Sequence, residues 1–213
     1  DALNDSGYFD IISITEDDKN RTKMLKQNLH RDELKDNSRD LSSFLSSLNI
    51  QVNVDFVTDA TISRVVQLIN KTNQFNLTTQ RYSEAEIKNF IELGYIVLYL
   101  QTSDRFGDSG ISGVSIIKNN NNIWLIDSFL LSCKILGKKI ETAFLCEIIS
   151  IVKSKGAIKL QGQYRPTLKN DITSSFYKNH GFKMINKKTN TWGYDLSTIP
   201  QNIDYIKINR INK

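Results

Sequence analysis

The sequence predicts an α/β domain: a mixed, mostly antiparallel central sheet with helices on both faces, preceded by an N-terminal helical arm. From residue 50 onward, apolar runs with strand-like spacing alternate with amphipathic helical segments. Before residue 50 the pattern is helical only and contains few apolar residues. We therefore expect a helical connector over residues 1–49 and one domain over residues 50–213.

The connector is expected to contain two helices. The first runs from about Thr15 to Asn37, and Thr15 with Asp18 forms a capping pattern at its start. Its apolar stripe is thin and consists of Met24, Leu25, Leu29 and Leu34. A second, shorter helix carries the apolar residues Leu41, Phe44, Leu45 and Leu48. So sparse an apolar face indicates an arm that packs on something outside the compact domain.

The domain is expected to open with an alternating strand over residues 50–56. Asp59 is the expected N-cap of the next helix, whose apolar face consists of Ile62, Val65, Val66 and Ile69. Ser83 and Glu86 form a capping box that begins another helix, and Gly94 marks its end.

Three apolar runs follow and predict an antiparallel meander: residues 95–100, 111–117 and 123–131. Gly137 is expected to open the strongest helix of the chain, with an apolar face of Ile140, Phe144, Ile148, Ile151 and Val152. The remaining expected elements are a strand at 158–160, a helix around 173–178, and strands near 184 and 192–196.

Composition limits the classes of function. The 213 residues, 39% of them hydrophobic, can form one substantial core, and no apolar run approaches the roughly 18 residues of a membrane span. Lysine and arginine are spread along the chain, so its net charge of +5 suits an acidic protein partner better than nucleic acid. Two cysteines without metal-ligand spacing, no leader and a first residue other than Met predict a cytoplasmic piece of a longer protein, with no metal site.

Residues 70–82 place uncharged hydrogen-bonding side chains densely around Phe75 and Leu77. Amide and hydroxyl groups both donate and accept, so the segment could bind a polyhydroxylated or amide-containing group. A polar turn with capping is the structural alternative. The candidate substrate-binding residues here are Asn73, Gln74, Phe75, Asn76 and Thr78.

This segment, continued to residue 87 as NKTNQFNLTTQRYSEAEI, resembles the C-terminal part of FkbH-like proteins. Further stretches match in the same order, so that the resemblance covers about residues 1–195: DRFGD at 104–108, IDSFLLSC at 126–133, GQYRPTLKN at 162–170 and FYKNHGF at 176–182. In that family a haloacid-dehalogenase-like phosphatase domain precedes an acyltransferase-like domain of the GNAT superfamily. The present chain resembles the second domain and its connector, and the predicted order of strands and helices is the GNAT order.

The resemblance implies an acyltransferase of the glyceryltransferase type that serves polyketide biosynthesis. A phosphoglycerate-derived glyceryl group would pass through a cysteine thioester to the phosphopantetheine thiol of an acyl carrier protein. The partners would be that carrier protein and the upstream phosphatase domain, and any Mg²⁺ would belong to the phosphatase. Phosphopantetheine or coenzyme A would be a co-substrate, with no cofactor resident in this chain.

GNAT proteins bind the coenzyme A pyrophosphate on the turn after the fourth strand, through an Arg/Gln-x-x-Gly-x-Gly/Ala motif at a helix N-terminus. Residues 134–139 read KILGKK, so the final small residue is replaced by Lys139. The lysines could instead meet the phosphate of a carrier-protein arm, or simply be solvated. The candidate phosphate-binding residues are Lys134, Gly137, Lys138 and Lys139.

Cys133 ends the fourth strand, where a GNAT fold splays its strands around the pantetheine thiol. The resemblance therefore implies that Cys133 carries the acyl group, and the following helix and Lys134 would favour its thiolate. A buried core thiol is the structural alternative. Cys146, between apolar neighbours in the middle of a helix, is interpreted as packing.

Three further residues are candidates for the catalytic site. His180 could act as a base toward Cys133, although a histidine in a turn is usually only exposed. Tyr177 occupies the position where many GNAT enzymes place the tyrosine that protonates the departing thiolate, and its alternative role is packing. Asp127 lies within an apolar run and needs a fixed partner. The polar cluster after the fifth strand adds substrate or pantetheine contacts at Arg165, Thr167 and Asn170.

Two rival functions remain open. The first is a coenzyme A-dependent N-acetyltransferase of an amino sugar or other amine, for which the fold and Tyr177 would suffice. The second is a non-catalytic module that docks a carrier protein. The departure at Lys139 argues against the first, and Cys133 together with the polar segment argues against the second.

Overall fold

The computed structural model describes residues 16–36, 38–198 and 203–210, and the chain divides into two compact units, Asp1–Ser47 and Leu48–Lys213. The first unit contains α1 (Glu16–Asp36) and α2 (Leu41–Ser47), which confirms both helices expected in the connector. Leu25 and Leu29 on α1 are exposed. The capping pattern at Thr15 and the side chain of Met24 lie outside the described residues.

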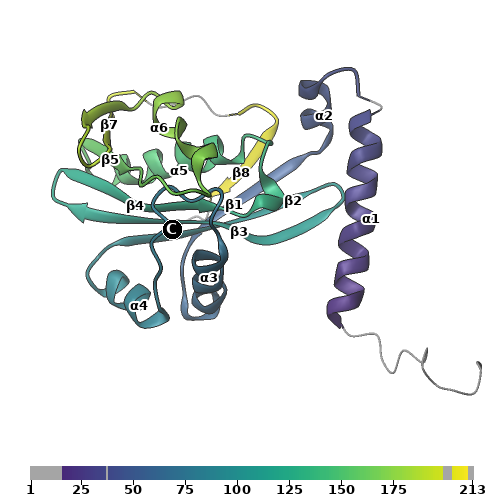
Figure 1. The fold of residues 1–213 in the computed structure, drawn as a ribbon, viewed down its shortest axis with the longest axis horizontal. Coiled ribbons are helices and arrows are strands. Elements are labelled where there is room, and N and C mark those ends of the chain that lie inside the picture. Colours follow the sequence, from purple (N-terminus) through teal and green to yellow (C-terminus); the bar gives the residue numbers. More distant parts are fainter. Residues whose placement is uncertain (1–15, 37, 199–202, 211–213) are drawn as a thin grey trace, which may run out of the picture. The chain divides into compact units, whose positions relative to one another are not determined.

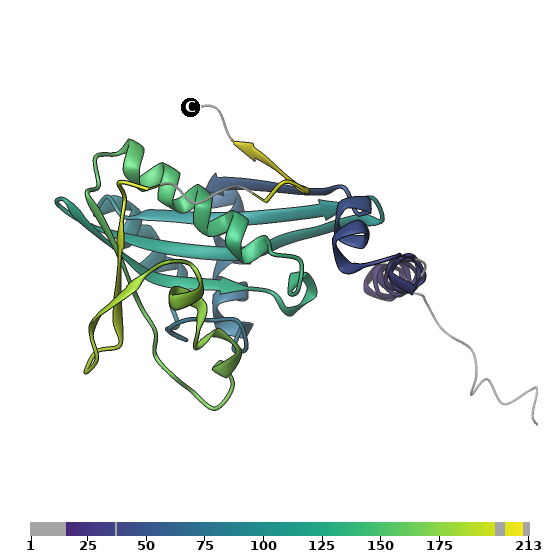
Figure 2. The same ribbon diagram turned by 90° about the horizontal axis from the view of Figure 1, so that it is seen from above.

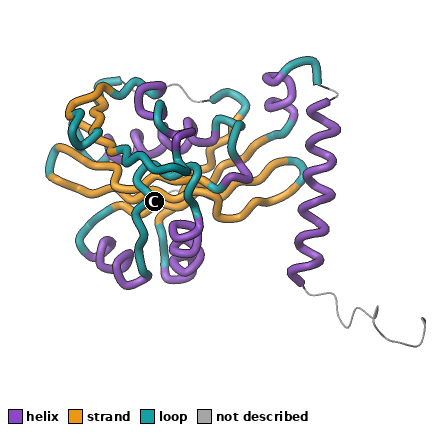
Figure 3. Tube along the Cα trace, in the orientation of Figure 1, coloured by secondary structure: helices purple, strands orange, loops and turns teal. Residues whose placement is uncertain are grey.

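The second unit is built on an eight-stranded sheet with the order β6-β7-β5-β4-β3-β2-β1-β8. Its strands are orange in Figure 3. Its strands are β1 (Ile50–Phe56), β2 (Ile96–Asp104), β3 (Gly107–Asn120), β4 (Ile123–Leu131), β5 (Lys159–Gln163), β6 (Lys183–Asn186), β7 (Thr191–Asp195) and β8 (Ile206–Arg210). Only the pairs β4–β5 and β1–β8 are parallel, which confirms the mixed, mostly antiparallel sheet. Strand β8 was not predicted, although Ile206 and Ile208 alternate with polar residues.

Helices cover both faces of the sheet, as predicted. Helices α3 (Asp59–Lys71) and α4 (Glu84–Glu92) lie on one face, whereas α5 (Ile140–Ser154) and α6 (Phe176–Asn179) lie on the other (Figures 1 and 2). Thr58, not Asp59, is the N-cap of α3, because Thr58 and Thr61 form a reciprocal capping box. No helix among the described residues is long and apolar enough to span a membrane.

Both ends of α4 follow from local sequence. The Ser83 hydroxyl accepts from the Glu86 amide while the Glu86 carboxylate accepts from the Ser83 amide, which confirms the predicted capping box. The hydrogen bonds that the Glu86 carboxylate accepts from the Ser83 amide and hydroxyl lower the pKa of Glu86. Gly94 has a φ of 79°, a left-handed conformation that favours glycine after a helix end. Helix α4 therefore begins and ends at defined residues.

Strand β4 changes its neighbour halfway along its length. On one edge it pairs with β3, but the register passes from Ile117↔Ile126 to Ile116↔Ser128 and leaves Asp127 as an extra residue. On the other edge it pairs with β5 only as far as Ile126↔Gly162. A bulge bends the strand that contains it, so β4 and β5 separate beyond Asp127.

Candidate active site

The gap between the ends of β4 and β5 is filled by the chain itself. The Leu77 amide donates to the Phe129 carbonyl and the Leu131 amide donates to the Phe75 carbonyl, each over 3.0 Å. On its other side, the segment accepts a 2.8 Å hydrogen bond at the Leu77 carbonyl from the Arg165 amide. Residues 75–78, which we call the inter-strand segment, therefore lie like a short strand between the end of β4 and the chain after β5.

Asn76 and Thr78 hold this segment in place. Both side chains, which were predicted to contact substrate, are buried. The Asn76 side chain donates to the Thr72 carbonyl (3.2 Å) and accepts from the Thr79 amide (2.8 Å), while the Thr78 hydroxyl donates to the Asp127 carbonyl (2.9 Å). Short polar side chains stabilise tight turns through such bonds, so these groups serve the backbone of their own loop.

Asn170, which was predicted to contact pantetheine, is bonded to backbone groups of two loops. It is fully buried, and its amide nitrogen donates to the carbonyls of Asn76 (2.8 Å) and Arg165 (2.9 Å). Its side-chain oxygen accepts from the Thr167 amide over 2.7 Å. The Arg165 side chain is exposed and bonds to Gln163, and the Thr167 hydroxyl accepts from the Lys169 amide. Asn170 therefore braces the loop after β5 against the inter-strand segment.

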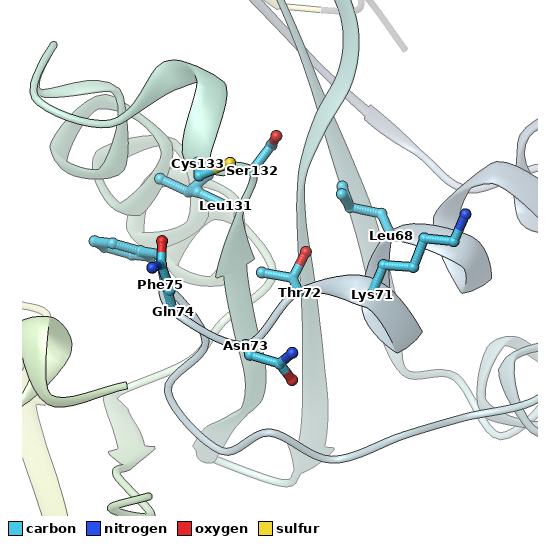
Figure 4. A pocket seen from close by; sticks show the side chains of 9 residues that line it. All are labelled: Leu68, Lys71, Thr72, Asn73, Gln74, Phe75, Leu131, Ser132 and Cys133. Atoms are coloured by element: carbon cyan, nitrogen blue, oxygen red, sulfur yellow. The ribbon is translucent and has the colours of Figure 1, made fainter. Parts of the chain in front are cut away.

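A pocket of about 350 Å³ lies beside Phe75, between the C-terminal end of α3 and the end of β4. Figure 4 shows its lining side chains, which are Leu68, Lys71, Thr72, Asn73, Gln74, Phe75, Leu131, Ser132 and Cys133. The thiol of Cys133 is exposed. The structure thus brings together Cys133 and three of the predicted substrate-binding residues, Asn73, Gln74 and Phe75.

The C-terminal turn of α3 contributes lining residues that were not predicted, Leu68, Lys71 and Thr72. Lys71 and Thr72 stand directly within the polar segment that drew attention in the sequence, so their position at the expected helix end was a usable signal. The Asn73 side-chain oxygen accepts from the Arg81 guanidinium, which orients its amide. The pocket therefore combines a thiol, a lysine and two amide side chains on a partly apolar wall.

The turn after Cys133 differs from the prediction. Cys133 begins a 3₁₀ turn, η1 (Cys133–Ile135), and α5 starts only at Ile140. Six residues therefore separate Cys133 from the start of α5, so the positive end of that helix does not directly follow the thiol. Gly137 and Lys139 both have left-handed backbones, with φ of 78° and 60°.

The four candidate phosphate-binding residues do not form one cluster of unpaired cations. The ammonium of Lys138 lies 3.2 Å from the Asp104 carboxylate, and both side chains are largely buried. Lys134, Gly137 and Lys139 are exposed. Glu141 occupies the first turn of α5, where an acidic side chain already complements the positive end of the helix.

These residues fit coenzyme A poorly in the arrangement that a GNAT-like fold implies. That arrangement needs an open path between the splayed strands and a small residue at the helix N-terminus. The inter-strand segment fills the path, and Lys139 replaces the small residue. Glu141 places a negative charge at the same helix end as the expected pyrophosphate.

His180 is engaged away from the pocket. Its Nδ1 lies 2.7 Å from the Phe176 carbonyl and its Nε2 lies 2.9 Å from the Thr142 hydroxyl. Because a carbonyl can only accept, Nδ1 donates to Phe176, and Nε2 shares a hydrogen bond with the Thr142 hydroxyl. His180 thus links the first turn of α5 to α6 and does not line the pocket of Cys133.

Tyr177 lies beneath the point where β4 and β5 separate. Its side chain is 2% exposed, and its hydroxyl has no hydrogen-bond partner among the described residues. Burial, with a further contribution from the negative charge of Asp127, raises the pKa of Tyr177 well above its ordinary value. The hydroxyl therefore remains a neutral, unused donor beside Gly162.

Substitution of Gly162 by alanine is expected to lower the free energy of unfolding by about 2 kcal/mol or more. A Cβ there would lie 2.2 Å from Cζ and 2.3 Å from the hydroxyl of the buried Tyr177 ring, which has no room to move. Urea denaturation would measure the loss. Gln161→Ala on the same strand serves as the control and should cost far less. A Gly162→Ala variant as stable as this control would contradict the observed packing.

Asp127 has the fixed partners that its position demanded. Its carboxylate lies 2.5 Å from the Lys118 ammonium and accepts from the hydroxyls of Tyr82 (2.6 Å) and Ser128 (3.2 Å). Burial, together with this hydrogen bond to Asp127, raises the pKa of Tyr82 well above its ordinary value. Lys118 and Tyr82 were not predicted as partners: Lys118 comes from the neighbouring strand β3, and Tyr82 lies 45 positions away in the sequence. The cluster anchors the bulge of β4.

Comparison with solved structures identifies the fold. The alignment with a putative acetyltransferase of the GNAT family from Desulfovibrio desulfuricans has a TM-score of 0.53 at 12% identity, covering 68% of this chain and 99% of that one. The ribosomal-protein-S18-alanine N-acetyltransferase from Escherichia coli gives 0.52 at 11% identity, covering 71% and 98%. An acetyltransferase of the GNAT family from Staphylococcus aureus gives 0.52 at 14% identity, covering 68% and 99%.

No protein-family model and no curated protein matches the sequence. The FkbH-like resemblance therefore remains an expectation. At identities this low, the similarity to solved structures establishes architecture only. The chain has the GNAT-like α/β fold.

Proposed function

We propose that this chain is an acyltransferase that carries a small hydroxyacyl group as a thioester on Cys133. The supporting observation is the exposed thiol of Cys133 in a pocket that also presents Lys71, Asn73 and Gln74. A thiolate is the nucleophilic form of cysteine, and a pocket at the end of a central strand holds it in a fixed position.

The proposed chemistry consists of two acyl exchanges. The Cys133 sulfur attacks the carbonyl carbon of the activated acyl group, and the bond from that carbon to the leaving group breaks. When the donor is a thioester, the departing thiolate takes up a proton. A carrier-protein phosphopantetheine thiolate then attacks the Cys133 thioester, and Cys133 leaves and recovers its thiol form. No oxidation or reduction occurs in either exchange.

The pocket suits an acyl group with hydroxyl substituents. The amides of Asn73 and Gln74 can each donate and accept, as neighbouring hydroxyls of a glyceryl group require. A site built to hydrogen-bond a hydroxyl discriminates strongly against analogues that lack it. Lys71 adds a positive charge to the wall of the pocket, on the side away from Cys133 (Figure 4).

N-acetyl transfer from acetyl-coenzyme A to an amine is the second candidate. It is favoured by the fold, since the structural neighbours include an N-acetyltransferase and a putative N-acetyltransferase. The unpartnered hydroxyl of Tyr177 is a further supporting observation, because a neutral tyrosine could donate a proton to a leaving thiolate. The poor fit of coenzyme A places this candidate second.

Intact-protein mass spectrometry tests the first proposal directly. The protein is mixed with glyceryl-loaded acyl carrier protein, and wild type is compared with Cys133→Ser and with Cys146→Ser. We expect a hydroxylamine-labile glyceryl adduct on wild type and Cys146→Ser, because Cys146 is buried in α5 and its pKa is raised by burial. No adduct on wild type, with the donor shown to be intact, would refute the relay. Acetylation of amines from acetyl-coenzyme A would then be the next assay.

A further inference from the structure

We infer that the inter-strand segment closes the path between β4 and β5 to the pantetheine arm of an acyl donor. The thioester at the end of that arm would then reach Cys133 through the pocket beside α3. The closure itself follows from the structure alone, whereas the route to Cys133 rests on the proposed function. The segment would make this chain select against donors whose arm must thread between the strands, coenzyme A among them.

Hydrogen bonding provides the first step. A strand edge left open by a splay offers backbone donors and acceptors, and an amide-bearing arm such as pantetheine could bind them as an added strand does. At this edge of β4, the Phe129 carbonyl and the Leu131 amide face the gap, and both are bonded to residues 75–77. An arm would have to break these bonds and also the bond between Arg165 and Leu77.

Packing provides the second step. Leu77 is fully buried, and Phe75 is 8% exposed. The ring of Phe75 makes an edge-to-face contact with the ring of Phe176, with 5.8 Å between the ring centroids. The centroid of the Phe129 ring lies 6.3 Å from that of Phe75. An arm that displaced the segment would therefore expose two large apolar side chains to water. The segment is part of the core rather than a loop resting on the surface.

Side-chain anchors provide the third step. The Thr78 hydroxyl holds the segment to the bulge carbonyl of Asp127, and the Asn170 amide holds the Asn76 carbonyl. The Asp127 side chain is in turn fixed by Lys118. The same bulge that separates β4 from β5 thus holds the residues that fill the separation.

The remaining way to Cys133 is the pocket lined by Lys71, Asn73 and Gln74. Phe75 lines this pocket and also belongs to the inter-strand segment, so one residue borders both the open and the closed path. An acyl group on Cys133 would share this pocket with the amide side chains of Asn73 and Gln74. Selection of the donor and selection of the acyl group would then occur on the same wall.

Hydrogen–deuterium exchange on the wild-type protein tests the closure. Coenzyme A is added at millimolar concentration under reducing conditions, and its binding is measured in parallel by calorimetry. We expect the amides of Leu77 and Leu131 to stay as protected as in the free protein, and binding to be too weak to measure. Measurable binding accompanied by faster exchange at these two amides would show that coenzyme A displaces the segment, and would overturn the inference.

A matched pair of variants tests whether the segment is what excludes the arm. Thr78→Val removes a buried hydroxyl bond to a β4 carbonyl from the segment, whereas Ser115→Ala removes an equivalent bond to the Ser128 carbonyl from the β3 side. We expect Thr78→Val to bind coenzyme A at least about tenfold more tightly than Ser115→Ala does. Equal affinities in the two variants would overturn the inference.

Neither measurement depends on the reactivity of Cys133. A protein that forms no glyceryl adduct yet keeps the segment closed would refute the proposed function and leave the closure intact. A protein that forms the adduct but admits coenzyme A between the strands would support the proposed function and overturn the closure.

Discussion

Serine in place of Cys133 is expected to lower the rate of glyceryl transfer to a carrier protein by about 10³-fold or more. The expectation follows because a serine hydroxyl is not ionised near neutral pH, and neither a histidine nor a carboxylate is among the described residues that line the pocket. Its neighbours in the pocket are a lysine and two amide side chains, while His180 is bonded to Phe176 and Thr142. Single-turnover transfer between two carrier proteins would give the rate.

Tyr177→Phe is the matched comparison. It removes only a hydroxyl that has no partner among the described residues, so glyceryl transfer should stay close to the wild-type rate. If the chain is instead an N-acetyltransferase, the pattern inverts. Tyr177→Phe would then slow acetyl transfer by about 10²-fold, the typical contribution of a general acid, and Cys133→Ser would have little effect.

Alanine in place of Asp127 is expected to lower the free energy of unfolding by about 3 kcal/mol. The change leaves the Lys118 ammonium and the Tyr82 hydroxyl without their carboxylate partner, which is itself only 5% exposed. Lys118 is one-third exposed and can partly regain water, which keeps the estimate at the lower end for a broken buried pair. Urea or thermal denaturation would measure the loss.

Asp59→Ala provides the control, because Asp59 also pairs with a lysine, Lys88, at 3.1 Å but on the surface. An exposed pair contributes at most about 1 kcal/mol, so this variant should remain close to wild type. Combining Asp127→Ala with Lys118→Met should recover part of the loss, since no uncompensated charge then remains. Strictly additive effects in the two variants would contradict the pairing.

Much of the fold could be predicted because its signals are local. The Ser83 and Glu86 capping box, the left-handed Gly94 and the three successive apolar runs each depend on neighbours within a few residues. Strand β8 was missed because it is short and pairs with β1, the strand most distant from it in the sequence of the domain. For such a strand, the only local signal is a short alternation of apolar and polar residues.

The candidate site could be predicted only in part. Cys133, Asn73, Gln74 and Phe75 were selected from sequence and do meet in one pocket. Asn76 was also selected because it is polar. The sequence does not distinguish a polar side chain that binds a ligand from one that bonds to its own backbone, as Asn76 does. Which of the two occurs depends on contacts such as Asn170 to Asn76, between residues 94 positions apart. No periodicity reports a contact of that range.

The inter-strand segment also bears on how the resting protein behaves in a crowded solution. A sheet whose central strands part would present unpaired amide and carbonyl groups in the middle of the molecule, and such open edges recruit strands from other chains. Here the Phe129 carbonyl and the Leu131 amide are paired by the chain's own residues. The protein therefore keeps this edge shielded from self-association without depending on a bound ligand to cover it.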